Sequence, residues 1–299
     1  MIQTGNTFAI SSYNLQVFSD STASWVEVVG ETTPYYQTSF VMTENVVMGT
    51  DYLFRVRASN VHGFSPVSDT VLIRADDRPE PPTMVSTVAD GLLVDFSWGE
   101  PVSDNGSTIT AYKLEILSAS GDMIEEVTHC VSDQPRLSCS IPFAELAIDS
   151  DSSSVYALLQ GDEVKAWATA YNINGWSEYS ALTITGVAVQ IKPHQMLAPT
   201  SGSITDEEQV HVQWLALTDT ATGGSTIVSY NLQWDRGTGV EDDWYTVVGE
   251  SPYSTLLEAT LSNEIVPGTL YKFRVRAANI HGFGDFSDTV TIKAAGIAD

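Results

Sequence analysis

Residues 49–75, GTDYLFRVRASNVHGFSPVSDTVLIRA, decide the fold, because they return at residues 268–294 as GTLYKFRVRAANIHGFGDFSDTVTIKA. The two stretches are identical at 18 of 27 positions, with a constant offset of 219 residues and no gap. Such a repeat is typical of a chain built from copies of one structural unit. It favours a structural or adhesive array over an enzyme.

Short runs rich in Val, Tyr, Phe and Thr, separated by Gly, Pro, Asn or Asp, predict successive antiparallel strands. In the first unit these runs are residues 13–18, 25–29, 35–41, 51–59 and 70–74. The period of two in YLFRVRA places Tyr52, Phe54 and Val56 on one face, and Arg55 and Arg57 on the other. One face is therefore expected in a core, and the other in water or under a partner. No stretch predicts an amphipathic helix.

Proline-containing junctions divide the chain. The sequence DDRPEPP at residues 76–82 separates the first unit from the second, and residues 192–199, KPHQMLAP, separate the second from the third. Proline cannot extend a sheet and it stiffens a linker. We therefore expect domains at residues 1–76, 77–191 and 192–299, joined with limited play.

The units share several landmarks. A tryptophan precedes an Asp/Asn/Gly-rich turn and a tyrosine follows it, at Trp98 and Trp214, and at Tyr13, Tyr112 and Tyr230. Later come G-x-x-Y-x-F-x-V-x-A-x-N and G-x-S-x-x-S. The second unit departs from the first motif, with Val164 in place of the tyrosine and Ala166 and Ala168 in place of Phe and Val, and the third unit has Gly284 in place of the first serine of the second motif. By these motifs the whole chain resembles tandem fibronectin type III domains. That resemblance implies an all-β fold of seven-stranded, two-sheet sandwiches with immunoglobulin-like topology.

The first unit is expected to lack strands A and B. Its opening TGNTFAISSYNL matches TGGSTIVSYNL, which directly precedes strand C of the third unit, and no tryptophan lies ahead of it. A sandwich without two strands exposes its core and a sheet edge. Two explanations remain open: the chain is a slice of a longer repeat protein, or a neighbouring molecule supplies the strands by strand addition. No donor segment is evident after strand G of the third unit, which favours the slice.

Composition narrows the class of partner. With 43% apolar and 10% aromatic residues the chain can build real cores. Its net charge of −25 opposes binding to nucleic acid or anionic lipid. No stretch reaches the roughly 20 apolar residues that cross a bilayer, so no membrane insertion is expected in this segment. The first residues lack the basic region and apolar core of a signal peptide.

Two features of the second unit suggest covalent modification. Cys130 and Cys139 flank VSDQPRLS, where two adjacent strands should be joined by a turn, so a disulfide closing that hairpin is expected. It would imply an oxidising compartment, whereas two free thiols would fit a cytosolic protein. Asn105 begins the sequon N-G-S in the turn before strand C, which predicts an exposed glycosylation site, although turn geometry alone explains the glycine.

No cofactor is expected, and calcium is the one alternative left open. Asp149 and Asp151 resemble the start of a calcium loop, but Gly and Glu are missing where an EF-hand needs them. Asp76 and Asp77 at the first junction could also bind calcium, although Arg78 sits beside them. In both places a solvated acidic loop is the simpler interpretation.

Outward positions on strand F offer a candidate contact surface. They carry Arg55, Arg57, Arg274, Arg276 and, in the second unit, Trp167. An outward Trp can anchor a protein or a sugar, or it can simply cover the stem of Lys113 on the next strand.

Catalysis finds no support in the sequence, since the histidines lack metal spacing and no nucleophile or phosphate-binding motif occurs. We expect a non-enzymatic, extracellular or cell-surface array whose partners are neighbouring copies, further repeats or glycans. The stretch S-C-S-I-P at residues 138–142, followed by Leu146, is similar to the large secreted and surface repeat proteins of single-celled eukaryotes. Alternatives are a receptor ectodomain, a carbohydrate-binding or spacer segment of a secreted enzyme, and a cytoplasmic scaffold.

Overall fold

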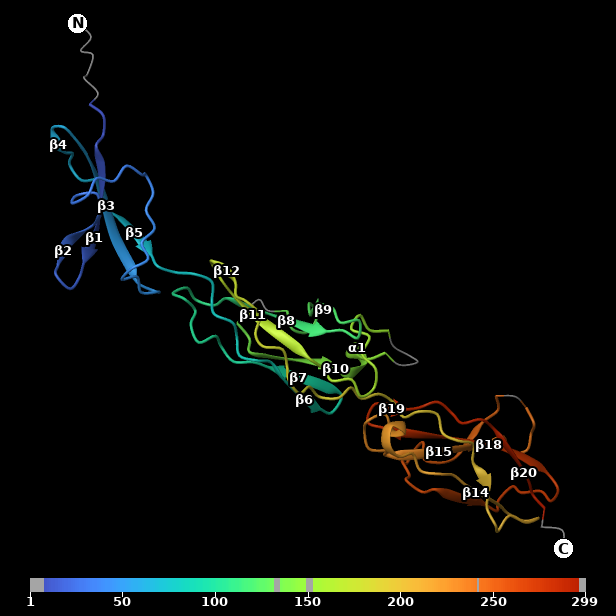
Figure 1. Cartoon of the computed structure of the whole chain (residues 1–299). Coiled ribbons are helices and arrows are strands. Elements are labelled where there is room, and N and C mark those ends of the chain that lie inside the picture. Colours follow the sequence, from blue (N-terminus) through green and yellow to red (C-terminus); the bar gives the residue numbers. More distant parts are fainter. Residues whose placement is uncertain (1–7, 132–134, 149–152, 241, 296–299) are drawn as a thin grey trace.

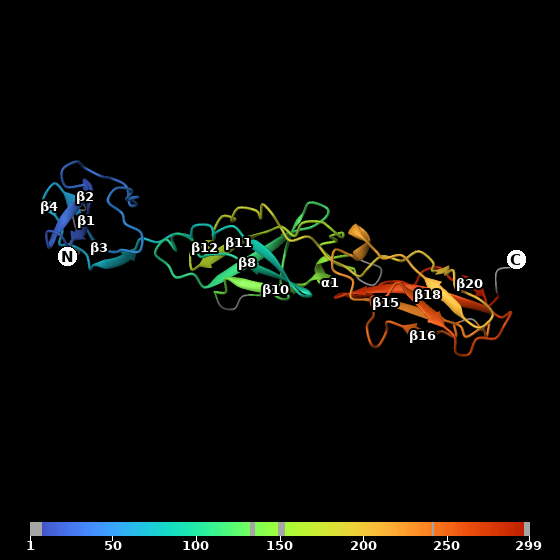
Figure 2. The ribbon, with the colours of Figure 1, turned by 90° about the horizontal axis from the view of Figure 1, so that it is seen from below.

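Three β-rich units follow one another in a line, with the two chain ends at opposite ends of the molecule (Figures 1 and 2). The structure, a computed structural model, describes residues 8–131, 135–148, 153–240 and 242–295. Nearly all regular structure is strand. The exceptions are the single turns α1 (Phe143–Leu146) and the 3-10 helix η1 (Asp219–Thr222).

The first unit is one five-stranded antiparallel sheet. Its strands are β1 (Ser12–Ser19), β2 (Ser24–Val29), β3 (Asp51–Asn60), β4 (Gly63–Phe64) and β5 (Val71–Arg74). They are ordered β2-β1-β3-β4, with β5 also paired to β3. The strand predicted at residues 35–41 is wrong: Tyr35 accepts one hydrogen bond from the Tyr13 amide of β1, but no strand forms a continuous ladder with the segment.

The second unit is a two-layer sandwich. One sheet has the order β10 (Ser138–Pro142), β7 (Leu93–Ser97), β6 (Ser86–Asp90), and the other the order β12 (Gly175–Trp176), β11 (Ala166–Asn172), β8 (Ala111–Leu117), β9 (Met123–Glu125). Alternate side chains of both sheets meet between the layers, where Phe96, Ile116 and Phe143 are fully buried. Trp98 is 8% exposed and packs edge-on against Tyr112.

The third unit has the same two layers. A three-stranded sheet contains β13 (Thr200–Ser201), β14 (Val210–Gln213) and β17 (Glu258–Leu261), and a five-stranded sheet contains β16 (Tyr245–Val248), β15 (Ser229–Trp234), β18 (Leu270–Asn279), β19 (Gly282–Phe283) and β20 (Val290–Lys293). Trp214, Leu232 and Phe273 lie in the core between them. The predicted all-β class of tandem sandwiches, with an incomplete first unit, is confirmed.

The first and third units share one strand register, but not the same burial. Leu15 pairs with Val56 as Leu232 pairs with Val275. Val275 is fully buried, whereas Val56 is 41% exposed, because no second sheet covers β1 and β3 in the described part of the first unit.

Candidate functional site

The outer face of the third unit carries arginines interleaved with aromatic rings. The guanidinium carbon of Arg274 lies 4.2 Å from the ring centre of Trp244 and 4.0 Å from that of Phe286. Arg276 lies 4.3 Å from the ring centre of Phe283 and 4.2 Å from that of Phe286. Phe286 therefore contacts both cations. Each contact is a cation–π interaction, a kind worth about 0.5–1 kcal/mol at exposed sites.

Hydrogen bonds from the neighbouring strand hold the same arginines in place. Arg274 Nε and Nη2 both donate to Gln233 Oε1, at 3.0 and 2.8 Å, and Arg276 Nε donates to Asn231 Oδ1 at 3.1 Å. In the first unit the equivalent pairs are Arg55 with Gln16 and Arg57 with Asn14. The orientation of the outward arginines is thus a property of the repeat.

The first unit has fewer of these contacts on its outer face, with one ring for each arginine. Arg55 lies over the Trp25 ring at 4.1 Å and Arg57 over the Phe64 ring at 4.2 Å. Arg57 Nη2 also forms an ion pair with Glu31 at 3.0 Å.

In the second unit, rings and a carboxylate replace the arginines. Trp167 stacks on Tyr179, with ring centres 4.4 Å apart, and its Nε1 donates to Glu115 Oε2 at 2.8 Å. Lys113 pairs with Glu115 at 2.9 Å, and its Nζ lies 5.5 Å from the ring centre of Trp176. Trp167 is therefore part of a packed outer face, in which stacked rings and Lys113 take the place of the arginine pair.

The sequence located the outward arginines but missed their aromatic partners. Trp244 comes just before β16, and Phe283 and Phe286 come from the stretch after β18; only the folded sheet brings these two segments beside Arg274 and Arg276. The result is a prearranged surface of cations and rings, suited to contacts with protein or sugar.

The junction between the first and second units is hydrogen-bonded through the linker. Asn172 Nδ2 of β11 donates to the carbonyls of Asp77 and Asp104, at 2.7 and 3.1 Å. The linker amide of Asp77 donates to the Asn105 carbonyl at 3.0 Å, and Arg74 Nε of β5 donates to the Gly106 carbonyl at 2.7 Å. A Cβ on Gly106 would lie 2.4 Å from the amide nitrogen of Gly49, so this close approach requires glycine.

The junction between the second and third units is built in the same way. Asn279 Nδ2 of β18 donates to the carbonyls of Ile191 and Thr222, at 2.7 and 2.9 Å. The amide of Ile191 donates to the carbonyl of Gly223 at 2.9 Å. Both asparagines are the final Asn of the strand F motif, at most 2% exposed, which gives this repeated residue a physical role.

Side chains of the second unit complete this junction. Gln160 Nε2 donates to the Thr220 carbonyl at 2.6 Å, and Gln160 Oε1 lies 2.7 Å from His194 Nε2. The His281 ring meets the Phe143 ring edge-on, with centres 5.5 Å apart, and its Nε2 lies 3.2 Å from Gln190 Oε1.

His281 makes this junction sensitive to acid. Burial lowers the pKa of His281 below its usual range, so the unfolded state binds the proton more readily than the folded state. Stability is therefore present at neutral pH and is lost as the pH falls below about 6.5 toward the folded pKa. We expect the third unit to resist urea less at pH 5 than at pH 7. His281→Asn, which copies Asn174 at the same position of the second unit, should reduce the difference in urea resistance between pH 5 and pH 7. An unchanged difference would contradict the assignment of this effect to His281.

The sequon at Asn105 lies in the first junction. Asn105 Nδ2 donates to the Arg78 carbonyl at 2.7 Å, and its Oδ1 accepts from Ser103 Oγ at 2.9 Å. The Asn105 side chain is half-buried, and its backbone has a positive φ of 50°. The turn is predicted to be exposed, but Asn105 is half-buried, and one of the two N–H groups of its Nδ2 already donates within the fold, which leaves only the other for a glycan.

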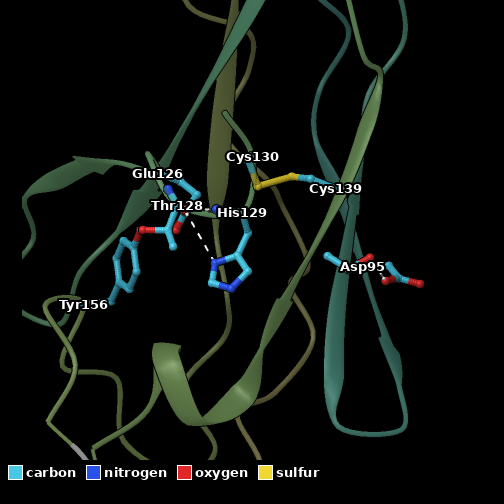
Figure 3. The surroundings of a disulfide bond; sticks show 8 residues. Asp95, Glu126, Thr128, His129, Cys130, Cys139 and Tyr156 are labelled. Carbon is cyan, nitrogen blue, oxygen red and sulfur yellow. Dashed lines mark hydrogen bonds and ion pairs between the residues drawn. A yellow bond between two sulfur atoms is a disulfide. The ribbon is translucent and has the colours of Figure 1, made fainter. Parts of the chain in front are cut away.

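The disulfide ties together the two layers of the second unit (Figure 3). Cys130 and Cys139 are joined, with their Cα atoms 5.4 Å apart. The predicted hairpin is wrong: Cys139 lies on β10, which pairs with β7, whereas Cys130 follows β9, which pairs with β8 in the opposite sheet. The bond therefore spans the sandwich.

A buried carboxylate lies beside the disulfide. Glu126, 6% exposed, accepts hydrogen bonds from the amides of Thr128 and His129 and from the Tyr156 hydroxyl, at 2.5, 2.7 and 2.8 Å (Figure 3). Burial raises the pKa of Glu126, but these donors outweigh burial and lower it overall. The pKa of Tyr156 is raised well above its usual range, mainly by burial and next by its hydrogen bond to Glu126. The group is a satisfied structural anion that fixes the segment leading to Cys130.

The calcium candidates that the structure describes, Asp76 and Asp77, accept hydrogen bonds from within the first junction. Asp76 accepts a hydrogen bond from Ser107 Oγ at 2.6 Å, which, with Asn174, lowers the pKa of the Asp76 carboxyl. Asp77 accepts from the Arg78 amide. Among the residues that the structure describes, no three His, Cys, Asp or Glu side chains gather to hold a metal ion. Asp149 and Asp151 lie outside the described residues.

In the described parts of the chain, no helix has both the length and the apolar character needed to cross a bilayer.

Comparison with known proteins agrees with the sandwich fold. Residues 197–293 match the family model of the Fibronectin type III domain. Human neogenin is 25% identical over 262 residues, which cover 85% of this chain and 16% of neogenin. Chicken Fibronectin type-III domain-containing protein 3a is 26% identical over 249 residues, covering 81% of this chain and 18% of that protein. The chain thus spans less than a fifth of either relative.

Among solved structures, the chicken CNTN1 FN1-FN3 domains match 98% of this chain and 91% of theirs at 16% identity. Their TM-score of 0.30 is too low to support any statement about the arrangement of the units.

Proposed function

We propose that this chain, which contains a fibronectin type III domain at residues 197–293, is a non-catalytic spacer and adhesive segment of an extracellular or cell-surface repeat protein. The two other units carry the same sequence landmarks, and the relatives include neogenin and a protein named for its fibronectin type III domains. Its expected partners are further repeats or copies of the same protein, and glycans.

The observation that carries this proposal is the repeated junction. Asn172 and Asn279 bind two carbonyls in the same way, one in the preceding linker and one in the turn that follows β7 or β14. A linker fixed by a buried amide holds successive units in a set relation, which is what a spacer needs. No comparable repetition marks a reaction site in the described residues.

The extracellular placement rests on chemistry. A disulfide across the second unit persists in an oxidising compartment and is rare in the cytosol. The S-C-S-I-P stretch around Cys139 extends the proposal to large secreted or surface proteins of single-celled eukaryotes. Fibril formation and a glycan at Asn105 belong to the same proposal.

A second candidate function is recognition of a protein or sugar ligand, as in a receptor ectodomain or a carbohydrate-binding module. The cation and ring surface around Arg274, Trp244 and Phe286 favours it, because its side chains are already ordered and lose little entropy on binding.

Intact mass of protein from its native source tests the placement. A polypeptide about two hydrogens lighter than the reduced form is expected, because the disulfide removes one hydrogen from each thiol. Free thiols on a bare polypeptide would contradict the secreted assignment and favour the cytoplasmic scaffold.

Small-angle scattering tests the spacer role. Asn279→Ala removes one hydrogen bond to the linker and one to the η1 turn, and leaves the Ile191 and Thr222 carbonyls without this donor, so the second junction should loosen and the distance distribution should broaden. Asn60→Ala is the matched control, because Asn60 occupies the same repeat position and accepts a bond from His62 within its own turn. Identical profiles for both variants and the parent would contradict a fixed junction.

A further inference from the structure

Within the described residues, the first unit presents one face of its sheet without a covering layer. The inward side chains are Tyr13, Leu15, Val17, Tyr52, Phe54, Val56, Ala58, Val71 and Ile73. Their counterparts in the core of the third unit are Tyr230, Leu232, Trp234, Tyr271, Phe273, Val275, Ala277, Val290 and Ile292. The two sets differ only at Val17, where the third unit has Trp234. We call the first set the open face.

The open face is apolar and accessible. Ile73 is 52% exposed where Ile292 is 5% exposed, and Val56 is 41% exposed where Val275 is fully buried. Leu15, Phe54, Val56 and Ile73 help to line a hollow of about 450 Å³ beside Phe40. The open face carries no charged side chain, so covering it requires no charge to leave water.

The third unit shows what covers the corresponding face. Val210 and Val212 of β14, with Trp214 directly after it, pack on the counterparts of the open face. β14 also supplies a hydrogen-bonding edge to β17, with Val210 opposite Leu261 and Val212 opposite Ala259.

The first unit already contains the sequence counterpart of β17. Residues 39–42, SFVM, correspond to Glu258–Leu261 at the offset of 219, with Phe40 and Met42 at the positions of Ala259 and Leu261. They form no strand, and Phe40 is 41% exposed. The missing element is thus a neighbour that offers both an apolar face and a backbone edge.

We propose that the open face is a docking surface for a strand pair like β13–β14, carried by a further repeat of the same protein. The incoming strand places apolar residues at alternate positions against Leu15, Phe54 and Val56, and its free edge pairs with residues 39–42, which then become a strand. A tryptophan after that strand packs on Tyr13, as Trp98 packs on Tyr112 in the second unit.

Residues 39–42 favour a strand pair over a whole second copy of the chain as the molecule that covers the open face. Two open faces packed against each other would cover Val56 and Ile73, but they would leave residues 39–42 without backbone partners. A strand pair satisfies both, and β14 already does so for Phe273 and β17.

An added strand pair tests the proposal in the full chain. Residues 195–221 are fused ahead of Thr4, so that the added segment joins TGN as its original copy joins TGG. Hydrogen exchange followed by mass spectrometry should show residues 39–42 slowing at least about tenfold, approaching the rate of residues 258–261. Binding of an apolar dye should fall in parallel.

The matched control is the same fusion with Val212→Asp in the added copy, which places a charge against the open face and should restore fast exchange. Sedimentation should find the fusion to be monomeric. Equal exchange in the fusion, its control and the parent would overturn the proposal. A parent chain that is dimeric and already protected at residues 39–42 would overturn it too, because a second copy would then be the occupant.

Discussion

Phe273→Ala is expected to destabilise the third unit by about 3–5 kcal/mol, the usual cost of removing a fully buried phenylalanine ring. The same substitution at the corresponding Phe54 should cost less than half as much, because the half-buried ring lacks an opposing sheet. Hydrogen exchange in increasing urea can follow each unit separately and gives both values from one chain.

This pair of substitutions compares a covered face with an uncovered one in the same repeat, with one further difference, because Trp234 stacks on Phe273 where Val17 stands opposite Phe54. Phe54 and Phe273 pair with Val17 and Trp234 in the same strand register, and both are followed by R-V-R-A. Equal losses at the two sites would mean that the open face is covered in solution. Equal losses in the strand-pair fusion, with unequal losses in the parent, would instead support docking.

Replacing both cysteines, Cys130→Ser with Cys139→Ser, is expected to lower the stability of the second unit by about 2–3 kcal/mol. The bond closes a loop with a sequence separation of 9, and the entropy that it removes from the unfolded chain has this magnitude. Thermal unfolding with and without a thiol reductant provides the measurement, and the reduced parent should resemble the double variant.

The first and third units contain no cysteine and act as controls within the same molecule. Their transitions should stay in place when the second unit shifts. A second unit that unfolds at the same temperature before and after reduction would show that the connection from Glu126 to β10 is held by packing alone.

The sequence predicted the strands whose pattern is local. Alternation in residues 51–59 located β3, and the repeat transferred that assignment to β18. Residues 35–41 have the same local character but form no strand, because a strand also needs a neighbour, and the local sequence does not reveal whether one is present. The hairpin expected at Cys130 failed for the same reason, since β10 finds its partner in β7, more than forty residues earlier.

In the candidate site, too, the sequence predicted the local features and missed the contacts between distant segments. Outward arginines follow from the period of two, so the alternation of residues alone places Arg274 and Arg276 on the outer face. Their partners Trp244 and Phe286 do not follow from it, because they lie outside the strand that carries the arginines. Asn279 was visible as a motif position, but its role depends on carbonyls 88 and 57 residues away.

The fixed linkers have a mechanical consequence. A chain pulled from both ends transmits the load through residues 76–82 and 192–199, and neither linker can straighten until Asn172 or Asn279 releases its carbonyls. These few bonds should give way before a sandwich does, so the molecule would first lengthen by a small, reversible step at each junction. Under sustained tension the two linkers would extend first, and the sandwiches would stay folded.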